Sequence, residues 1–145
     1  HVIIRAEVLN PPTDETTAST QLQTLIDRIG MKVLMGPFAK YVEMPGNRGL
    51  TVAAIIETSH VVLHAWDEQE PALVQLDVYT CGEFDPRRVF EWIEEYDNPT
   101  KMEYKYLDRE TSLTLSDLPE DPLEHDRYTT KELVDATNNI LYLKR

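Results

Sequence analysis

The chain has 145 residues, of which 41% are hydrophobic; this length and composition are typical of one folded domain with a substantial core, not of a disordered chain. Its net charge of −12 repels phosphate backbones and anionic lipids, which argues against nucleic acid or a membrane as a partner. A single cysteine, with no signal peptide and no long apolar run, predicts a cytoplasmic protein.

Strand and helix patterns alternate in the first third of the chain. Residues 1–8 alternate and are rich in β-branched side chains, which predicts a strand. Residues 16–29 are expected to form a helix that ends at Gly30. One or two strands are expected over 31–44, followed by a turn-rich loop over 45–49. The predicted helix carries its apolar residues at helical spacing, at Leu22, Leu25, Ile26 and Ile29.

The middle of the chain predicts a run of strands and then a second helix. Three strands are expected, over 50–57, 59–66 and 73–80. Asp85-Pro86 is a good helix start, and a last core strand is expected over 100–107. The buried stripe of the second helix is expected to consist of Val89, Phe90, Ile93 and Tyr96.

This order of elements, with short connections, predicts an α+β fold: a two-layer sandwich in which an antiparallel sheet carries two helices on one face. The domain is expected to span 1–107. Residues 108–145 are expected to form a C-terminal extension that packs on or near the same domain, with a surface excursion over 117–126. A closing helix is expected over 130–142, with Leu133, Val134, Ala136, Ile140 and Leu141 as its apolar set.

Side chains alternate across a strand, so whether a residue's number is odd or even assigns it to one face of the sheet. The face expected to meet the helices is aliphatic, with Val52, Ala54, Ile56, Val61, Leu63, Leu76 and Val78. The opposite face collects most of the polar and reactive groups, including Thr51, Glu57, His60, His64, Gln75, Asp77, Tyr79 and Cys81. The sequence therefore places its chemistry on the face away from the helices.

Several of these residues also have structural interpretations. A lone cysteine is usually a small buried hydrophobe. Cys81, however, alternates to the same face as the polar residues of its strand, which favours a reactive thiol. His60 and His64 have the spacing of a helical metal-binding pair, yet on a strand they lie ~13 Å apart, so no metal site is expected. Either histidine alone is more often structural than catalytic. Trp66 is either a core residue or the wall of a pocket.

Two sequence blocks, over 49–68 and 76–82, resemble the bacterial and archaeal S-adenosylmethionine decarboxylase family, the small pyruvoyl-dependent enzymes of polyamine synthesis. The resemblance extends from about residue 1 to about 107. The family shows a Ser-His pair, a second histidine in a His-x-Trp-x-Glu run, and an Asp-Val-aromatic-Thr-Cys-Gly strand. The matching segments here are Ser59-His60, His64-Ala65-Trp66-Asp67-Glu68 and Asp77-Val78-Tyr79-Thr80-Cys81-Gly82.

The resemblance implies a proenzyme that cuts itself between Thr58 and Ser59. The Ser59 hydroxyl would attack the preceding carbonyl and convert the amide to an ester. Loss of the Ser59 α-proton would then eliminate the ester, and the resulting dehydroalanine would hydrolyse to a pyruvoyl group and ammonia. Thr51 matches a family serine whose hydroxyl supports the first step, and His64 matches a histidine associated with processing.

For turnover, the resemblance implies that the pyruvoyl group made from Ser59 forms an imine with the amine of S-adenosylmethionine and accepts the electrons released as carbon dioxide departs. Cys81 matches the thiol that returns a proton to the substrate. His60, Trp66 and Glu68 are the residues expected to bind the substrate. The family also implies a homodimer with sites built from both protomers.

The chain departs from the family pattern at several positions. Thr58 stands where the residue before the cleavage serine is usually glutamate, and the region before Gly49 lacks a phenylalanine that stacks on adenine in the family. The loop over 67–72 is longer than usual, and 108–145 exceeds the family core. Two alternatives therefore stand beside the main interpretation: a repurposed homologue that decarboxylates L-ornithine or L-arginine, and an unprocessed homologue without enzymatic activity.

Overall fold

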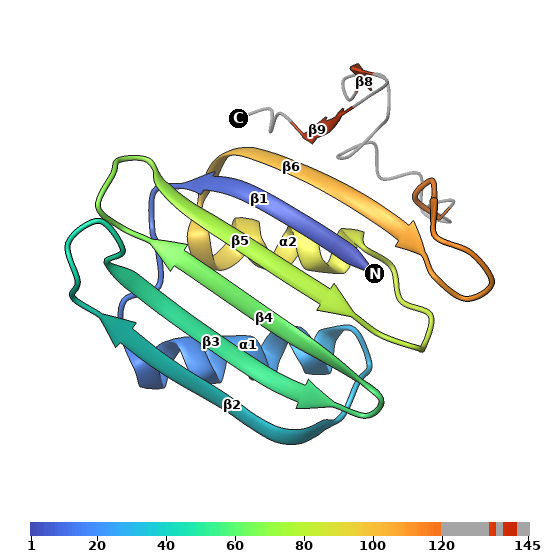
Figure 1. Ribbon diagram of the computed structural model, residues 1–145, viewed down its shortest axis with the longest axis horizontal. Coiled ribbons are helices and arrows are strands. Elements are labelled where there is room, and N and C mark those ends of the chain that lie inside the picture. Colours follow the sequence, from blue (N-terminus) through green and yellow to red (C-terminus); the bar gives the residue numbers. More distant parts are fainter. Residues whose placement is uncertain (120–133, 136–137, 142–145) are drawn as a thin grey trace.

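A computed structural model of the chain describes residues 1–119, 134–135 and 138–141 (Figure 1). Its helices and strands are β1 (Val2–Val8), α1 (Glu15–Arg28), β2 (Val33–Val42), β3 (Gly49–Ile56), β4 (Ser59–Trp66), β5 (Ala72–Tyr79), α2 (Arg87–Asp97), β6 (Pro99–Asp108), β7 (Thr114–Leu115), β8 (Val134–Asp135) and β9 (Asn138–Leu141). The elements predicted from 1 to 107 are all present, with bounds that differ by one or two residues. The segment over 31–44 forms one strand, β2, with irregular pairing between Val33 and Phe38.

The strands form an antiparallel sheet in the order β2-β3-β4-β5-β1-β6-β9-β8, and β7 pairs with β6. The first strand of the chain therefore lies inside the sheet, between β5 and β6. Both helices cover the same face (Figure 1). The predicted two-layer α+β sandwich is confirmed, and the opposite face of the sheet, called the open face below, carries no helix among the described residues.

The core lies between the sheet and the two helices, as the hydrophobic periodicity predicts. Apolar residues at every second position of β1, β3, β4 and β5 are buried against the apolar stripes of α1 and α2. Trp92, which lies outside the predicted stripe, is 2% exposed. Its Nε1 donates to Gln21 O at 3.0 Å and to Thr24 Oγ1 at 3.1 Å. This side chain joins the two helices, so α2 buries a wider face than the predicted stripe.

The predicted helix over 130–142 is wrong where the structure describes it, because 134–135 and 138–141 are strands. β9 pairs with β6, and β8 pairs with β9. Strand β6 would otherwise present unpaired backbone groups at the edge of the sheet, and Asn138 and Asn139 are poor helix formers. The rest of that segment, and most of the predicted excursion over 117–126, lie outside the described residues. The division at 107 stays a prediction.

No helix in the described part of the chain combines the length and the apolarity that crossing a bilayer requires.

A buried carboxyl group closes the second helix. Asp97, the last residue of α2, is 1% exposed, and its Oδ2 has no hydrogen-bond partner among the described residues. Burial raises the pKa of Asp97 to about 7. Since the unfolded carboxyl titrates near pH 4, the folded state binds the extra proton between about pH 4 and pH 7. Folding stability therefore falls as the pH rises through this window and remains lowered above it.

Replacing Asp97 with asparagine is expected to remove this pH dependence. From pH 5 to pH 8 the parent should lose on the order of 2 kcal/mol of unfolding free energy relative to the variant. Urea unfolding of both proteins at the two pH values measures it. An equal difference at both pH values would show that Asp97 is ionised throughout.

Candidate active site

The Thr58–Ser59 bond lies at the tip of a tight hairpin. Ile56 pairs with Ser59, so Glu57 and Thr58 alone connect β3 to β4. Thr58 has φ +64°, a left-handed conformation that such turns require but that a β-branched residue rarely adopts, at a cost of roughly 1–3 kcal/mol. Its Oγ1 donates to the Glu57 carbonyl at 2.6 Å. Ser59 thus begins its strand directly after a strained peptide.

Cys81 lies against both sides of this bond. The register of β4 on β5 pairs His60 with Tyr79, so the residues just after β5 come level with the hairpin tip. The Cys81 Sγ lies 3.5 Å from the Ser59 Oγ and 3.5 Å from the Thr58 carbonyl oxygen. Hydrogen bonds with Thr58 and then Ser59 lower the pKa of the exposed Cys81 thiol. The Cys81 thiol is therefore in contact with both a hydroxyl and a carbonyl.

Thr51 and His64 form a second pair, away from the hairpin tip. They are opposite each other in the register of β3 and β4, and the Thr51 Oγ1 lies 2.8 Å from the His64 Nδ1. Five residues along an extended strand span ~16 Å, so His64 lies far from Ser59. Within one chain, the structure does not bring the two residues predicted to assist processing to the bond that is predicted to break.

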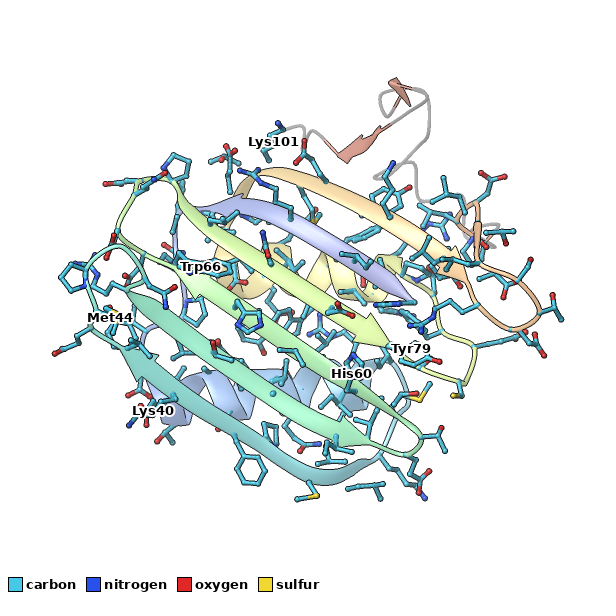
Figure 2. All side chains as sticks on the ribbon, viewed as in Figure 1. Lys40, Met44, His60, Trp66, Tyr79 and Lys101 are labelled. Carbon is cyan, nitrogen blue, oxygen red and sulfur yellow. The ribbon has the colours of Figure 1, made fainter. Side chains whose placement is uncertain are left out.

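The open face carries a groove of about 630 Å³, lined by residues of β1, β4, β5 and β6 that include His60, His64 and Asp77. The His60 Nε2 lies 3.8 Å from the Asp77 Oδ1, and the His60 ring meets Tyr79 edge-on. Figure 2 shows His60, Trp66 and Tyr79 along this face. The sequence pattern places Asp77 on this face but suggests no role for it. Asp77 and His60 alternate to the same face of neighbouring strands, and this was the signal that could have predicted their contact.

A second hollow, of about 760 Å³, opens beside Cys81. Tyr79, Phe84, Tyr106 and Arg109 contribute to its walls. The Arg109 guanidinium carbon stands 4.1 Å from the centre of the Tyr79 ring, a cation–π arrangement. Space for a bound molecule therefore exists on the side of the thiol that faces away from β4.

Trp66 and Glu68 lie at the other end of β4, where they hold the loop over 45–49. The Trp66 Nε1 donates to the Asn47 Oδ1 at 3.0 Å. The Glu68 carboxylate accepts from the backbone nitrogens of Gly46 at 2.7 Å and Arg48 at 3.2 Å. Gly49 has φ +155°, and a Cβ there would overlap the Ala65 carbonyl, so only glycine lets the loop approach β4 this closely.

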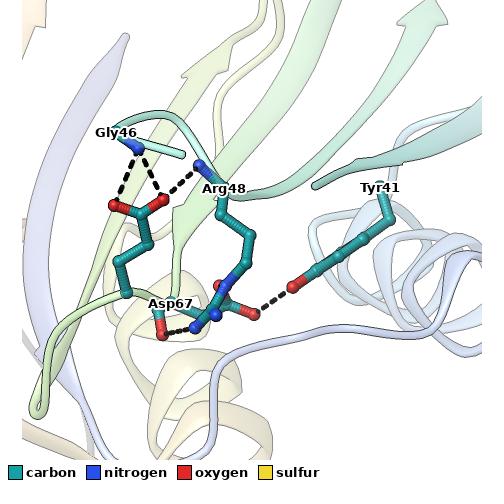
Figure 3. A network of polar contacts seen from close by, with 5 residues as sticks. Tyr41, Gly46, Arg48 and Asp67 are labelled. Atoms are coloured by element: carbon teal, nitrogen blue, oxygen red, sulfur yellow. Dashed lines mark hydrogen bonds and ion pairs between the residues drawn. The ribbon is translucent and has the colours of Figure 1, made fainter. Parts of the chain in front are cut away.

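The same loop is held by the partly buried carboxylate of Asp67, to which the sequence pattern assigned no role. The Asp67 side chain accepts from the Tyr41 hydroxyl and from the Arg48 Nε, each at 2.7 Å (Figure 3). The two hydrogen bonds outweigh desolvation and lower the pKa of Asp67, although burial alone would raise it. The turn chemistry of 45–49 was visible in the sequence, but these partners come from β2 and from the end of β4.

Replacing Trp66 with alanine is expected to raise KM for the substrate about tenfold and to change Tm little. The ring is only half-buried, packs at a tilt on His64 with ring centres 5.8 Å apart, and lines a hollow of about 240 Å³. Steady-state kinetics and thermal melts measure both quantities. Trp92→Phe is the matched control, because replacing this core tryptophan should lower Tm and leave KM unchanged. Loss of stability with unchanged KM in Trp66→Ala would make Trp66 a purely structural residue.

Comparison with solved structures finds the same fold. The crystal structure of the adenosylmethionine decarboxylase from Aquifex aeolicus VF5 superposes with a TM-score of 0.53, covering 77% of this chain and 94% of that one at 20% identity. The structural class is therefore that of the adenosylmethionine decarboxylase α+β sandwich.

The sequence gives the family itself. The profile described as S-adenosylmethionine decarboxylase matches residues 2–110, and the chain belongs to this family. The S-adenosylmethionine decarboxylase proenzyme of Pyrobaculum arsenaticum is 47% identical over 64 residues, which is 43% of this chain, and that of Pyrobaculum islandicum is 45% identical over 64 residues. In each case the match covers 50% of the relative. The chain thus aligns with about half the length of these curated relatives.

Proposed function

We propose that the chain is a self-processing, pyruvoyl-dependent decarboxylase of polyamine biosynthesis that acts on S-adenosylmethionine. The observation that carries the proposal is the contact of the Cys81 thiol with both the Ser59 hydroxyl and the Thr58 carbonyl, at the hairpin where the family pattern places self-cleavage. The membership of the family and the names of the Pyrobaculum relatives support the choice of reaction and substrate.

In this proposal Ser59 Oγ attacks the strained Thr58 carbonyl, and cleavage leaves a pyruvoyl group at the start of the second fragment. A pyruvoyl group supplies an electron sink for the loss of carbon dioxide from an α-amino acid. Cys81, already beside that position, holds the proton that the substrate carbon must receive. His60, the second residue of β4, is assigned to substrate binding at this site. Trp66 and Glu68 lie at the other end of β4, further from Ser59 than His64, so they are assigned to substrate binding at the site of a second copy.

The working form is proposed to be a homodimer. Thr51 and His64 stand ~16 Å from Ser59 along the strand, so they reach a cleavage site only if it belongs to a second copy. The open face also exposes apolar side chains that water does not favour, with Met35 55%, Phe38 66% and Ile55 49% exposed. Sedimentation equilibrium should give twice the chain mass, and Ile55→Lys should reduce it to the mass of one chain. A monomeric parent protein would leave Thr51 and His64 without a role in cleavage.

L-ornithine or L-arginine is the second candidate substrate. The favouring observation is that the polar groups of Trp66 and Glu68 are engaged by the loop over 45–49, which leaves fewer groups free to hold a nucleoside. The net charge of −12 attracts a basic amino acid as well as a sulfonium.

Release of carbon dioxide from carboxyl-labelled S-adenosylmethionine, L-ornithine and L-arginine, assayed side by side with aged protein, tests the proposal. The highest kcat/KM is expected with S-adenosylmethionine. The highest kcat/KM with ornithine or arginine would select the second candidate. No release from any of the three would support the non-enzymatic homologue.

A further inference from the structure

We propose that Cys81 also acts before any substrate binds, as the group that transfers the proton in the first step of self-cleavage. The inference rests on the proposed function, because it concerns the same Thr58–Ser59 bond. It assigns the thiol a second role, in the precursor, that is separate from the protonation of the substrate.

The geometry of the unbroken chain carries this inference. A chain of two hydrogen bonds runs from the Ser59 hydroxyl to the Cys81 sulfur and from that sulfur to the Thr58 carbonyl oxygen, with both heavy-atom distances at 3.5 Å. The nucleophile and the oxygen that becomes negatively charged are therefore linked through one sulfur atom. Such an arrangement both accepts the proton of the attacking group and donates to the developing oxyanion.

The histidines of β4 are not placed for this role within the chain. His64 is paired with Thr51, five residues further along the strand. His60 alternates to the open face, where it faces Asp77 and Tyr79. Cys81 is fixed at the hairpin tip because β5 ends at Tyr79, beside the first residues of β4.

The step balances without a co-reactant. Loss of the thiol proton to solvent gives the reactive thiolate. The thiolate takes the Ser59 hydroxyl proton as Oγ bonds to the Thr58 carbonyl carbon, and the carbonyl electron pair moves onto oxygen. The resulting thiol donates a hydrogen bond to that oxygen. When the electron pair returns, the bond between the Thr58 carbonyl carbon and the Ser59 nitrogen breaks, and the thiol proton passes to the leaving nitrogen. The products are an ester at Ser59 Oγ, a free amine and the original thiolate.

The test follows cleavage of freshly purified precursor in the parent protein, Cys81→Ala and Cys81→Ser, with and without hydroxylamine. Hydroxylamine cuts an ester but not an amide, so it reports how much of the chain has completed the first step. Cys81→Ala is expected to cleave on the order of 10²-fold more slowly, with no acceleration by hydroxylamine. Cys81→Ser, which keeps a donor and acceptor at the position, should recover part of the rate.

The pH profile separates this role from a merely structural one. The cleavage rate of the parent should rise with pH through the titration of the thiol, and the inflection should be lost in Cys81→Ser. Equal cleavage rates in parent and Cys81→Ala would overturn the inference while the proposed function stands. So would rapid release of fragments from Cys81→Ala by hydroxylamine, because the block would then follow ester formation. A parent protein that never cleaves would instead overturn the proposed function, and this inference with it.

Discussion

Ser59→Ala is expected to yield a full-length chain that never cleaves and releases no carbon dioxide. The variant removes the one oxygen that attacks the Thr58 carbonyl, so neither the ester nor the ketone forms from it. The fold should persist, because Ser59 begins β4 and is only partly buried, with its hydroxyl directed to Cys81. Denaturing electrophoresis over several days, with circular dichroism as a check on folding, measures the outcome.

Ser19→Ala is the matched control for this variant. It removes a serine hydroxyl from α1, in the opposite layer of the sandwich, and should cleave at the parent rate. Cleavage of Ser59→Ala at the same peptide bond would show that another group attacks Thr58, and the assignment of Ser59 would be wrong.

Cys81→Ala is expected to lower kcat by about 10²–10⁴-fold per processed chain, with a small change in KM. The thiol lies 3.5 Å from the Ser59 hydroxyl, so it is placed to protonate a molecule bound at residue 59. Because the variant is also expected to process slowly, the preparation must be aged and the keto terminus titrated before kcat is calculated.

The comparison with Cys81→Ser separates proton donation from packing. A hydroxyl is a much weaker acid than a thiol, so this variant should keep the substrate affinity of the parent and lose most of its kcat. A processed Cys81→Ala enzyme with kcat within a fewfold of the parent would remove Cys81 from turnover altogether.

Much of the fold could be predicted because local patterns and burial agree. Alternation along β3, β4 and β5 separates an aliphatic face from a polar one, and the structure buries Val52, Leu63 and Leu76 as parity requires. The helices follow their apolar spacing, and Asp14 caps the first one by accepting from the Thr17 backbone nitrogen at 2.7 Å. These signals lie within a few residues of one another, so sequence order alone reveals them.

The rest depends on contacts between distant segments. The strand β9 exists because β6 has a free edge, a condition that residues 130–142 do not encode locally. Asp67 binds Tyr41 across 26 positions of sequence, and Trp92 reaches Gln21 across 71. The contact of Cys81 with Thr58 and Ser59 likewise follows from the register of β4 on β5, which parity constrains but does not fix.

The separation of Ser59 from His64 is another feature of the site that the sequence alone could not predict in full. Ser59 and His64 differ by an odd number of positions, so alternation along the strand assigns them to opposite faces, and the resemblance alone grouped them in one reaction. The structure adds that the Thr51–His64 pair lies at mid-strand and the Ser59–Cys81 contact at the strand entrance. Symmetry between two copies is the physical means proposed here to bring them together.

Denaturing mass spectrometry of the purified, aged parent protein tests the central claim most directly. Two fragments are expected, covering 1–58 and 59–145. The second should be about 17 Da lighter than a fragment that begins with serine, because a ketone has replaced the amine and hydroxyl of Ser59. A single mass for the intact 145-residue chain after prolonged incubation would contradict it.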